Sequence, residues 1–107
     1  LRAGITNGAV DELLPTEYVL NQNYPNPFNP ATTIEFALPV PGEVKLEVFN
    51  VLGQTVSTLH RGQLEAGYHS IVWDGTNKAG ETVASGVYFY RLTADDYTKS
   101  RKMLLLK

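Results

Sequence analysis

Apolar and polar residues alternate in short runs along most of the chain. The clearest run is 43–48, in which Val44, Leu46 and Val48 lie on one side of an extended strand and charged residues on the other. Such runs recur about every 8–12 residues with turn signals between them, and no window has the helical period. The predicted strands are 18–20, 33–38, 43–48, 55–60, 68–73, 86–94 and 97–106. This pattern predicts an all-β protein, an immunoglobulin-like antiparallel β-sandwich of about seven strands.

The stretch 24–30 reads Tyr-Pro-Asn-Pro-Phe-Asn-Pro and interrupts the alternation. Each proline fixes its own φ and disfavours helical geometry in the residue before it, so this proline segment is stiff and non-helical. We expect it to cross one end of the sandwich, with Phe28 or Tyr24 filling the core and the asparagine side chains bonding local backbone. The cysteine and tryptophan pattern of antibody domains is absent, so true immunoglobulin ancestry is not implied.

The domain is predicted to span 18–107. Residues 1–17 mix glycine, alanine and acids without a sustained period, and we interpret them as a linker or the remnant of a preceding domain. Within them, 9–14 has room for one helical turn. The start at Leu1, without an initiator methionine or a signal peptide, indicates a cut point inside a longer protein.

Composition and charge narrow the function classes. The 107 residues suit one domain, and their net charge of −2 argues against general nucleic-acid binding. There is no cysteine, and no apolar run approaches the ~18 residues of a transmembrane helix. The last eleven residues are basic, and we expect their cations on the outer face of a solvated terminal strand.

Candidate catalytic and metal-binding groups are few. His60 and His69 are too few for a zinc site without cysteines unless carboxylates help, and we expect His69 to be partly buried and hydrogen-bonded on the face that it shares with Trp73. The loop 74–81 is rich in oxygen but lacks the EF-hand frame, so we expect its polar side chains to bond the loop backbone, with calcium as the alternative. No nucleophile motif or phosphate-binding glycine loop occurs. The sequence therefore predicts neither an enzyme nor a cofactor.

Aromatic residues suggest an alternative function. A carbohydrate-binding or adhesive module on a secreted enzyme would stack sugars on exposed rings, for which the candidates are Phe28, Trp73, Tyr88 and Tyr90. The same aromatics at period two are what a sandwich core needs. Exposure of Trp73 separates these readings, because an exposed ring favours sugar binding and a buried ring does not.

Several segments resemble, in order, the motifs of one family: 23–34 with Leu38-Pro39, 44–56, 66–69, 73–75, 84–92 and 102–107. Together they make 18–107 similar to the type A C-terminal sorting domain of the type IX secretion system. A weaker resemblance, through Trp73-Asp74-Gly75 and Gly86-Val87-Tyr88, is to the immunoglobulin-like domain of flagellar hook-capping proteins. That resemblance leaves a structural spacer as a third reading.

The sorting-domain resemblance implies an address label for a cargo protein covalently linked at its N-terminal side. It implies transit through the periplasm of a Gram-negative bacterium and recognition there by the type IX translocon and its shuttle protein. A sortase then commonly removes the domain, and the cargo is attached to lipopolysaccharide at the cell surface or released. The motif residues that we expect to be structural are Tyr24, Pro25, Asn26, Pro27, Phe28, Asn29, Pro30, Gly53, Trp73, Asp74, Gly75, Gly86 and Tyr88.

The terminal strand is the predicted recognition surface. A last strand offers an edge with unpaired backbone groups, and its cations discourage self-association while attracting an acidic receptor groove. The predicted recognition residues are Lys99, Arg101, Lys102, Met103, Leu104, Leu105, Leu106 and Lys107.

Overall fold

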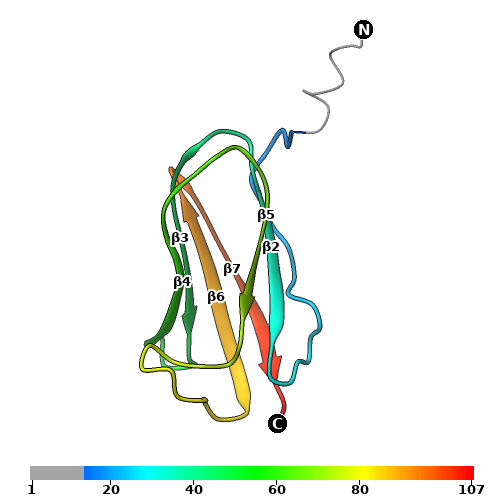
Figure 1. Ribbon diagram of the computed structural model, residues 1–107, viewed down its shortest axis with the longest axis vertical. Coiled ribbons are helices and arrows are strands. Elements are labelled where there is room, and N and C mark those ends of the chain that lie inside the picture. The colour runs from blue at the N-terminus through cyan, green and yellow to red at the C-terminus, as the bar shows by residue number, and fades with distance from the viewer. Residues whose placement is uncertain (1–13) are drawn as a thin grey trace, which may run out of the picture.

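The computed structural model describes residues 14–107 and shows seven strands. Figure 1 shows the six longer strands running along the long axis of the domain. Within the described residues no helix forms, and hence none long and apolar enough to cross a membrane. The possible helical turn at 9–14 lies, except for its last residue, outside the described residues. The strands are β1 (Val19–Leu20), β2 (Thr32–Leu38), β3 (Gly42–Phe49), β4 (Thr55–Leu64), β5 (Gly67–Trp73), β6 (Gly86–Ala94) and β7 (Tyr97–Leu105).

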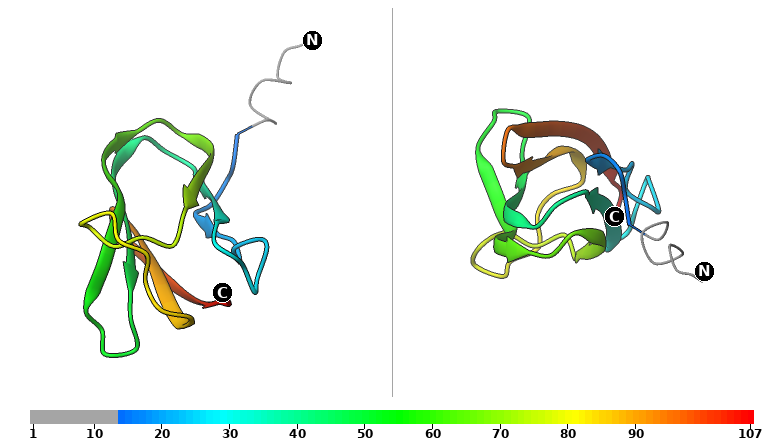
Figure 2. Two further views of the ribbon diagram at one scale, coloured as in Figure 1. Left: turned by 60° about the horizontal axis from the view of Figure 1, so that its bottom comes forward. Right: turned by 90° about the horizontal axis from the view of Figure 1, so that it is seen from above.

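The strands form two antiparallel sheets. One has the order β1-β2-β5 and the other the order β4-β3-β6-β7. Figure 2 shows the two sheets from two further directions. Buried residues of both sheets form one hydrophobic cluster. The prediction of an all-β, immunoglobulin-like sandwich of about seven strands is confirmed.

The core is made by the faces that the alternation predicts. Val44, Leu46 and Val48 of β3 are buried, while Lys45 on the other face is partly exposed. The strand β6 alternates in the same way, with Tyr88 and its period-two neighbours facing inward. The buried hydrophobic cluster is Leu20, Phe28, Ile34, Phe36, Leu38, Val44, Leu46, Val48, Trp73, Tyr88, Tyr90, Leu92, Ala94, Met103 and Leu105.

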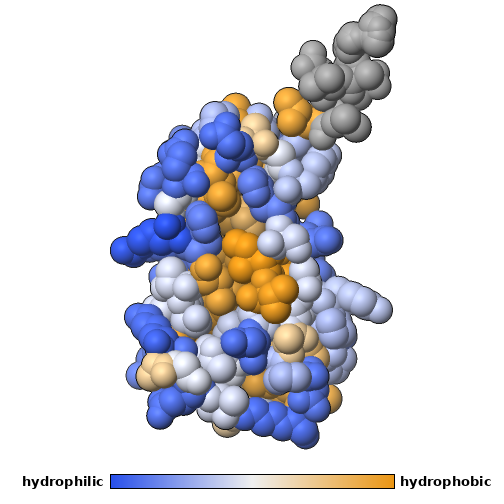
Figure 3. Space-filling view, in the orientation of Figure 1, coloured by the Kyte–Doolittle hydropathy of each residue, from blue (hydrophilic) through white to orange (hydrophobic). Residues whose placement is uncertain are grey.

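One open side of the sandwich carries apolar residues that are only partly buried. The edge strands β4 and β5 flank it, and Leu59 and Ile71 pack against the core there while remaining partly exposed. Figure 3 shows apolar surface at the centre of this face of the molecule.

The strand β4 is longer than the sequence predicts. We expected it to end at His60, with a connection through 61–67, but it continues to Leu64 in register with β3, where Gly42 pairs with Leu64. The pairing shifts between Leu46 and Glu47, which is an irregularity of the β-bulge kind. A bulge reverses the alternation along one strand, so a simple period-two pattern ends before the strand does.

Glu47 is a buried carboxylate on the outer face of the four-stranded sheet. Only 8% of the residue is exposed, and its Oε1 lies 3.4 Å from Arg91 Nη2 and 3.6 Å from Lys45 Nζ. The Arg91 guanidinium also stacks over the ring of Phe49, 4.5 Å from its centroid. The carboxylate is therefore held between two cations, as the low exposure of an ionised group requires.

Tyr90 ties the N-terminal segment to the centre of β6. Its fully buried hydroxyl donates to the Asn21 carbonyl (2.6 Å) and accepts from the Asn23 N–H (2.8 Å). Burial raises the pKa of Tyr90, an effect that the Asn23 N–H donor and the Arg101 charge oppose. The hydroxyl therefore remains a donor at neutral pH.

Replacing Tyr90 by phenylalanine should destabilise the domain. The change leaves the Asn21 carbonyl and the buried Asn23 N–H without their partner, which costs about 1–3 kcal/mol of unfolding free energy. Urea unfolding followed by fluorescence measures this. Tyr24→Phe, on an exposed ring, is the control and should change stability by less than about 0.5 kcal/mol. Equal stability of the two variants would contradict the role given to the Tyr90 hydroxyl.

Candidate functional site

The proline segment lies against the C-terminal end of β7. Phe28 N–H donates to the Leu104 carbonyl, and Leu106 N–H donates to the Phe28 carbonyl, each at 3.0 Å. Phe28 and Leu105 form a parallel β-bridge, so the segment pairs over a short length with the outer edge of the terminal strand. Figures 1 and 2 both show the loop that carries the segment beside the C-terminus. Two predicted motifs from opposite ends of the domain are thus joined.

Phe28 is the residue of the segment that fills the core. It is 2% exposed, and its ring centroid lies 5.7 Å from that of Trp73, which in turn makes an edge contact of 5.4 Å with Tyr88. Tyr24 is 80% exposed. The expectation that Phe28 or Tyr24 fills the core is confirmed, and the ring that does so is Phe28.

The asparagines bond both near and far. Asn23 Nδ2 donates to Thr32 Oγ1 (2.9 Å) and to the Pro25 carbonyl (3.2 Å), as local bonding predicts. Asn26 does not follow the expectation, because its Oδ1 accepts from the N–H of Leu104 (3.0 Å), 78 residues away. The side chain of Asn26 therefore bonds to the terminal strand and not to the segment itself. The peptide bonds before all three prolines of the segment are cis.

Gly75 completes the junction. Its φ is +80°, and a Cβ at this position would lie 3.0 Å from the Pro30 carbonyl oxygen. The adjacent Trp73 is held by a hydrogen bond from its Nε1 to the Thr76 carbonyl (2.9 Å). The close approach of two backbones therefore explains why glycine occupies position 75.

The other predicted motif residues lie around this junction or at turns. Gly86 pairs with Leu105, and Gly53 has a φ of +81° in the turn between β3 and β4. Asp74 is exposed and accepts from the Thr76 N–H at 3.1 Å. The residues of the segment that stay exposed are Tyr24, Pro25, Asn26, Pro27, Asn29 and Pro30.

The outer edge of β7 is open over only part of its length. The proline segment bonds Leu104 and Leu106, and Gln22 Nε2 donates to the Lys102 carbonyl (2.7 Å). In an antiparallel strand every second residue points its backbone groups to the same edge, so Thr98 and Ser100 point to this edge as well. Both are exposed. The predicted open edge is therefore limited to the stretch around 98–100, and the expectation of unpaired backbone groups is wrong for the Lys102 carbonyl and for Leu104.

The eight predicted recognition residues do not form one surface. Met103 and Leu105 are buried in the core, so their side chains cannot be read in this folded state. Arg101 is half-buried and donates from Nε to the Leu20 carbonyl. Leu104 is also half-buried, whereas the exposed members of the set are Lys99, Lys102, Leu106 and Lys107. We had expected the cations on one outer face, but the alternation of the strand puts Lys99 and Lys102 on opposite faces.

The histidines are engaged within the domain. His69 Nε2 lies 2.8 Å from the Glu65 carbonyl and its ring stacks on Phe36, so the prediction of a partly buried, hydrogen-bonded His69 is confirmed. His60 Nε2 lies 3.3 Å from the Gly62 carbonyl. Among residues 14–107, no group of three or more histidine and acidic side chains is placed to hold a metal ion.

The alternative prediction of an exposed aromatic platform for sugar binding is wrong. Phe28, Trp73 and Tyr90 are each at most 2% exposed, and Tyr88 is also buried, with its hydroxyl donating to the Ala84 carbonyl (2.7 Å). Burial raises the pKa of Tyr88. These rings are core residues and offer no surface for stacking.

Two loops of the same design, which the sequence reading missed, frame an open pocket at one end of the sandwich. In 50–54 the Asn50 Oδ1 accepts from the N–H groups of Leu52 and Gln54, each at 3.0 Å, while its Nδ2 donates to Gln54 Oε1 (2.8 Å). The loop 77–81 repeats this pattern with Asn77 and Glu81. The signal was present in the sequence as a repeated N-x-x-G-(Q/E) pattern.

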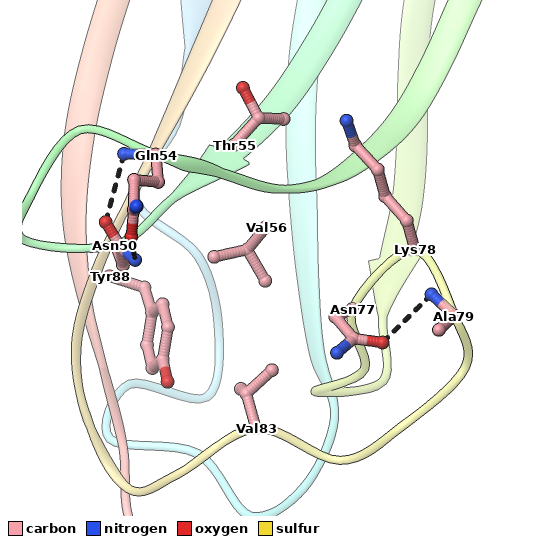
Figure 4. A pocket seen from close by; sticks show the side chains of 9 residues that line it. All are labelled: Asn50, Gln54, Thr55, Val56, Asn77, Lys78, Ala79, Val83 and Tyr88. Carbon is pink, nitrogen blue, oxygen red and sulfur yellow. Dashed lines mark hydrogen bonds between the residues drawn. The ribbon is translucent and has the colours of Figure 1, made fainter.

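The side chains that line this pocket do not suit catalysis. Figure 4 shows Asn50 directed at Gln54 and Asn77 directed at the Ala79 backbone, with Val56, Val83 and Tyr88 between the two loops. The amide groups are thus already bonded within their own loops. We find no nucleophile beside a base among these lining residues.

Truncating Phe28 should open the end of the sandwich. Phe28→Ala removes a buried ring from contact with Trp73 and should lower the free energy of unfolding by about 3–5 kcal/mol. Thermal and urea unfolding measure the loss. Tyr24→Ala is the matched control in the same segment and should be neutral within about 0.5 kcal/mol. A neutral Phe28→Ala would refute the assignment of this ring to the core.

Gly75 and Gly80 form a second matched pair, because both have φ near +80° and only Gly75 touches another backbone. Gly80→Ala carries the cost of a left-handed alanine alone, about 1–2 kcal/mol. Gly75→Ala should cost clearly more, since the new Cβ must displace the Pro30 carbonyl. Urea unfolding of both variants gives the comparison. A Gly75→Ala cost no larger than that of Gly80→Ala would show that the contact yields freely.

Comparison with known proteins gives the context of this geometry. The chain is 43% identical over 44 residues to the basal-body rod modification protein FlgD of Salmonella typhimurium. That match covers 41% of this chain and 19% of the relative, so this chain corresponds to only a small part of that protein.

Two solved structures share the fold. PorU from Porphyromonas gingivalis matches with a TM-score of 0.65 and 22% identity, over 83% of this chain and 9% of that one. PorZ from the same organism, described as an essential surface component of the type IX secretion system, matches with a TM-score of 0.56 and 21% identity. That match covers 97% of this chain and 13% of PorZ. At these identities the likeness is one of fold alone.

The family described as FlgD Ig-like domain matches residues 28–97, which is most of the sandwich. This match confirms the weaker of the two predicted resemblances, and the sorting-domain assignment stays a prediction. The chain belongs to the FlgD Ig-like domain family.

Proposed function

We propose that residues 18–107 act as a type A C-terminal sorting domain, which directs a covalently linked cargo protein through the type IX secretion system. The observation that carries this proposal is the junction of the proline segment with the terminal strand. Two of the motifs on which the resemblance rests, the first and the last, bond to one another through Phe28, Asn26 and Leu104. The fold shared with PorZ, a component of that system, supports the same proposal.

The junction suits a label that is read in the folded state. The proline segment holds the C-terminal end of β7 in the sandwich, while the backbone of Thr98 and Ser100 stays available at the edge. An extended segment of a receptor can add to such an edge through main-chain hydrogen bonds. Lys99 lies within the open stretch and Lys102 just beyond it, and these exposed cations would attract a receptor groove with acidic side chains.

The proposed partners are the translocon, its shuttle protein and a sortase, with transit through the periplasm and delivery to the cell surface or medium. In this role the domain is a recognition element and not an enzyme. It needs neither nucleic acid nor cofactor. Its output is the location of the cargo.

The family match favours a second candidate, a structural module like the Ig-like domain of FlgD. Such a module would work through its sandwich surfaces as part of an assembly, and its terminal strand would carry no address. The two candidates differ in whether the domain alone moves a passenger protein. A passenger assay therefore separates them.

A reporter fusion tests the sorting function. A periplasmic fluorescent protein followed by residues 18–107 should reach the surface or the medium of a host with a working type IX system. The double change Lys99→Glu and Lys102→Glu should leave the reporter in the periplasm, because it reverses both exposed charges beside the open edge. Cell fractionation and fluorescence of intact cells measure the distribution.

The matched control reverses two exposed cations far from that edge, Arg61→Glu and Lys78→Glu, and should be exported normally. Charge reversal is a sharper test than deletion of 102–107, since deletion would also remove Met103 and Leu105 from the core. Thermal unfolding of each variant checks that it remains folded. Retention of the unmodified fusion in the periplasm would contradict the sorting proposal and favour the structural module.

A further inference from the structure

An exposed apolar tip lies at the end of the β3–β4 turn. Val51 is 67% exposed and Leu52 is 79% exposed, although both could be polar without loss of core packing. Loop tips in soluble domains are usually polar, and a paired aliphatic tip indicates a contact with something else. This apolar tip is defined as Val51 and Leu52.

The loop under the apolar tip is held in one shape. Besides the side-chain bonds of Asn50, its N–H bonds the Gln54 carbonyl and its carbonyl accepts from Gly53, both at 3.0 Å. The twin loop 77–81 has the equivalent backbone bonds but carries Lys78 and Ala79 at its tip. The loop design therefore does not require aliphatic residues. The apolar tip is an additional property of 50–54, and it is presented at low entropic cost.

A groove on the outer face of the four-stranded sheet lies beside the apolar tip. Phe49 of β3 and Phe89 of β6 are cross-strand partners and line the groove together with Val51. The Arg91 guanidinium forms part of its wall, and Ser100 of β7 completes it. Both phenylalanine rings are partly exposed, as are many aromatic residues at protein interfaces.

The charge around this groove is positive, although the whole chain is acidic. Lys102 pairs with Phe89 across β6 and β7 and points to the same outer face, where it is exposed. Arg91 lies on this face too, and the nearby Glu47 is buried and already held by two cations. An approaching surface would therefore meet basic and apolar groups together.

We infer that this groove and the apolar tip form a docking surface for an acidic, aliphatic segment of a partner protein. Acidic side chains would pair with Arg91 and Lys102 while aliphatic side chains pack on Phe49, Phe89 and the apolar tip. A second copy fits poorly, because two basic faces would repel. A lipid surface also fits less well, since it would cover the apolar tip but leave the hollow behind it unfilled. The inference does not depend on the proposed sorting function or on the open edge of β7.

Short synthetic peptides serve as probes in an NMR titration of the isotope-labelled full chain. One alternates aspartate and leucine, a second alternates aspartate and serine, and a third alternates lysine and leucine. The first should shift the backbone signals of Phe49, Val51 and Phe89, and the other two should have little effect. The double change Val51→Ser and Leu52→Ser should weaken the first peptide at least about tenfold, roughly the effect of losing buried aliphatic contacts.

The twin loop provides the control, because Lys78→Ser and Ala79→Ser alter the tip of the same loop design and should leave affinity within about twofold. Equal responses to the acidic–leucine and basic–leucine peptides would overturn the inference. So would shifts confined to Thr98–Lys102, or no shifts at all. Binding to phosphatidylglycerol vesicles that is lost in the Val51→Ser, Leu52→Ser variant, without peptide binding, would overturn it in favour of a lipid surface.

Discussion

The structure depends on Phe28, a buried ring on a segment that the prolines keep stiff. Its side chain packs on Trp73, and its backbone bonds Leu104 and Leu106, so a single residue joins both sheets to the chain end. Prolines lower the conformational freedom of the unfolded segment, which reduces the entropy lost when Phe28 is seated. Gly75 must then be glycine, because the Pro30 carbonyl passes against it. Much of the motif pattern follows from closing this end of the sandwich.

Alternation was sufficient to predict the fold because each strand buries one face. The alternation identified the residues of β3 and β6 that face inward. Their register is well defined because a shift of one position would expose every apolar residue of the strand. The alternation failed on β4, where the shift opposite Leu46 and Glu47 reverses the faces and Gly62 adds no side chain to the pattern. The pairing that extends this strand to Leu64 comes from β3, which a local pattern does not contain.

The site was less predictable, for two physical reasons. Tyr24 and Phe28 are both aromatic and each is adjacent to one proline, and only the three-dimensional path of the segment decides which ring faces Trp73. On β7 the alternation did separate Met103 from Lys102, but the basic composition of the strand suggested a uniformly solvated face. The bond from Leu104 to Asn26 spans 78 residues, and no local rule indicates it.

The β7 edge is divided into a covered part and an open part, so the terminal strand is protected from uncontrolled pairing while some of its backbone stays available. Exposed edges invite uncontrolled pairing, so a fold covers them or places charge beside them, and this edge uses both means. The proline segment covers the part around Leu104, and lysines flank the part around Ser100. Lys102 lies at the boundary, with its carbonyl bonded by Gln22 and its side chain beside Phe89 on the outer face. Ligands at the open edge and in the outer-face groove would therefore meet at one ammonium group, and two acidic partners bound at once would compete for it.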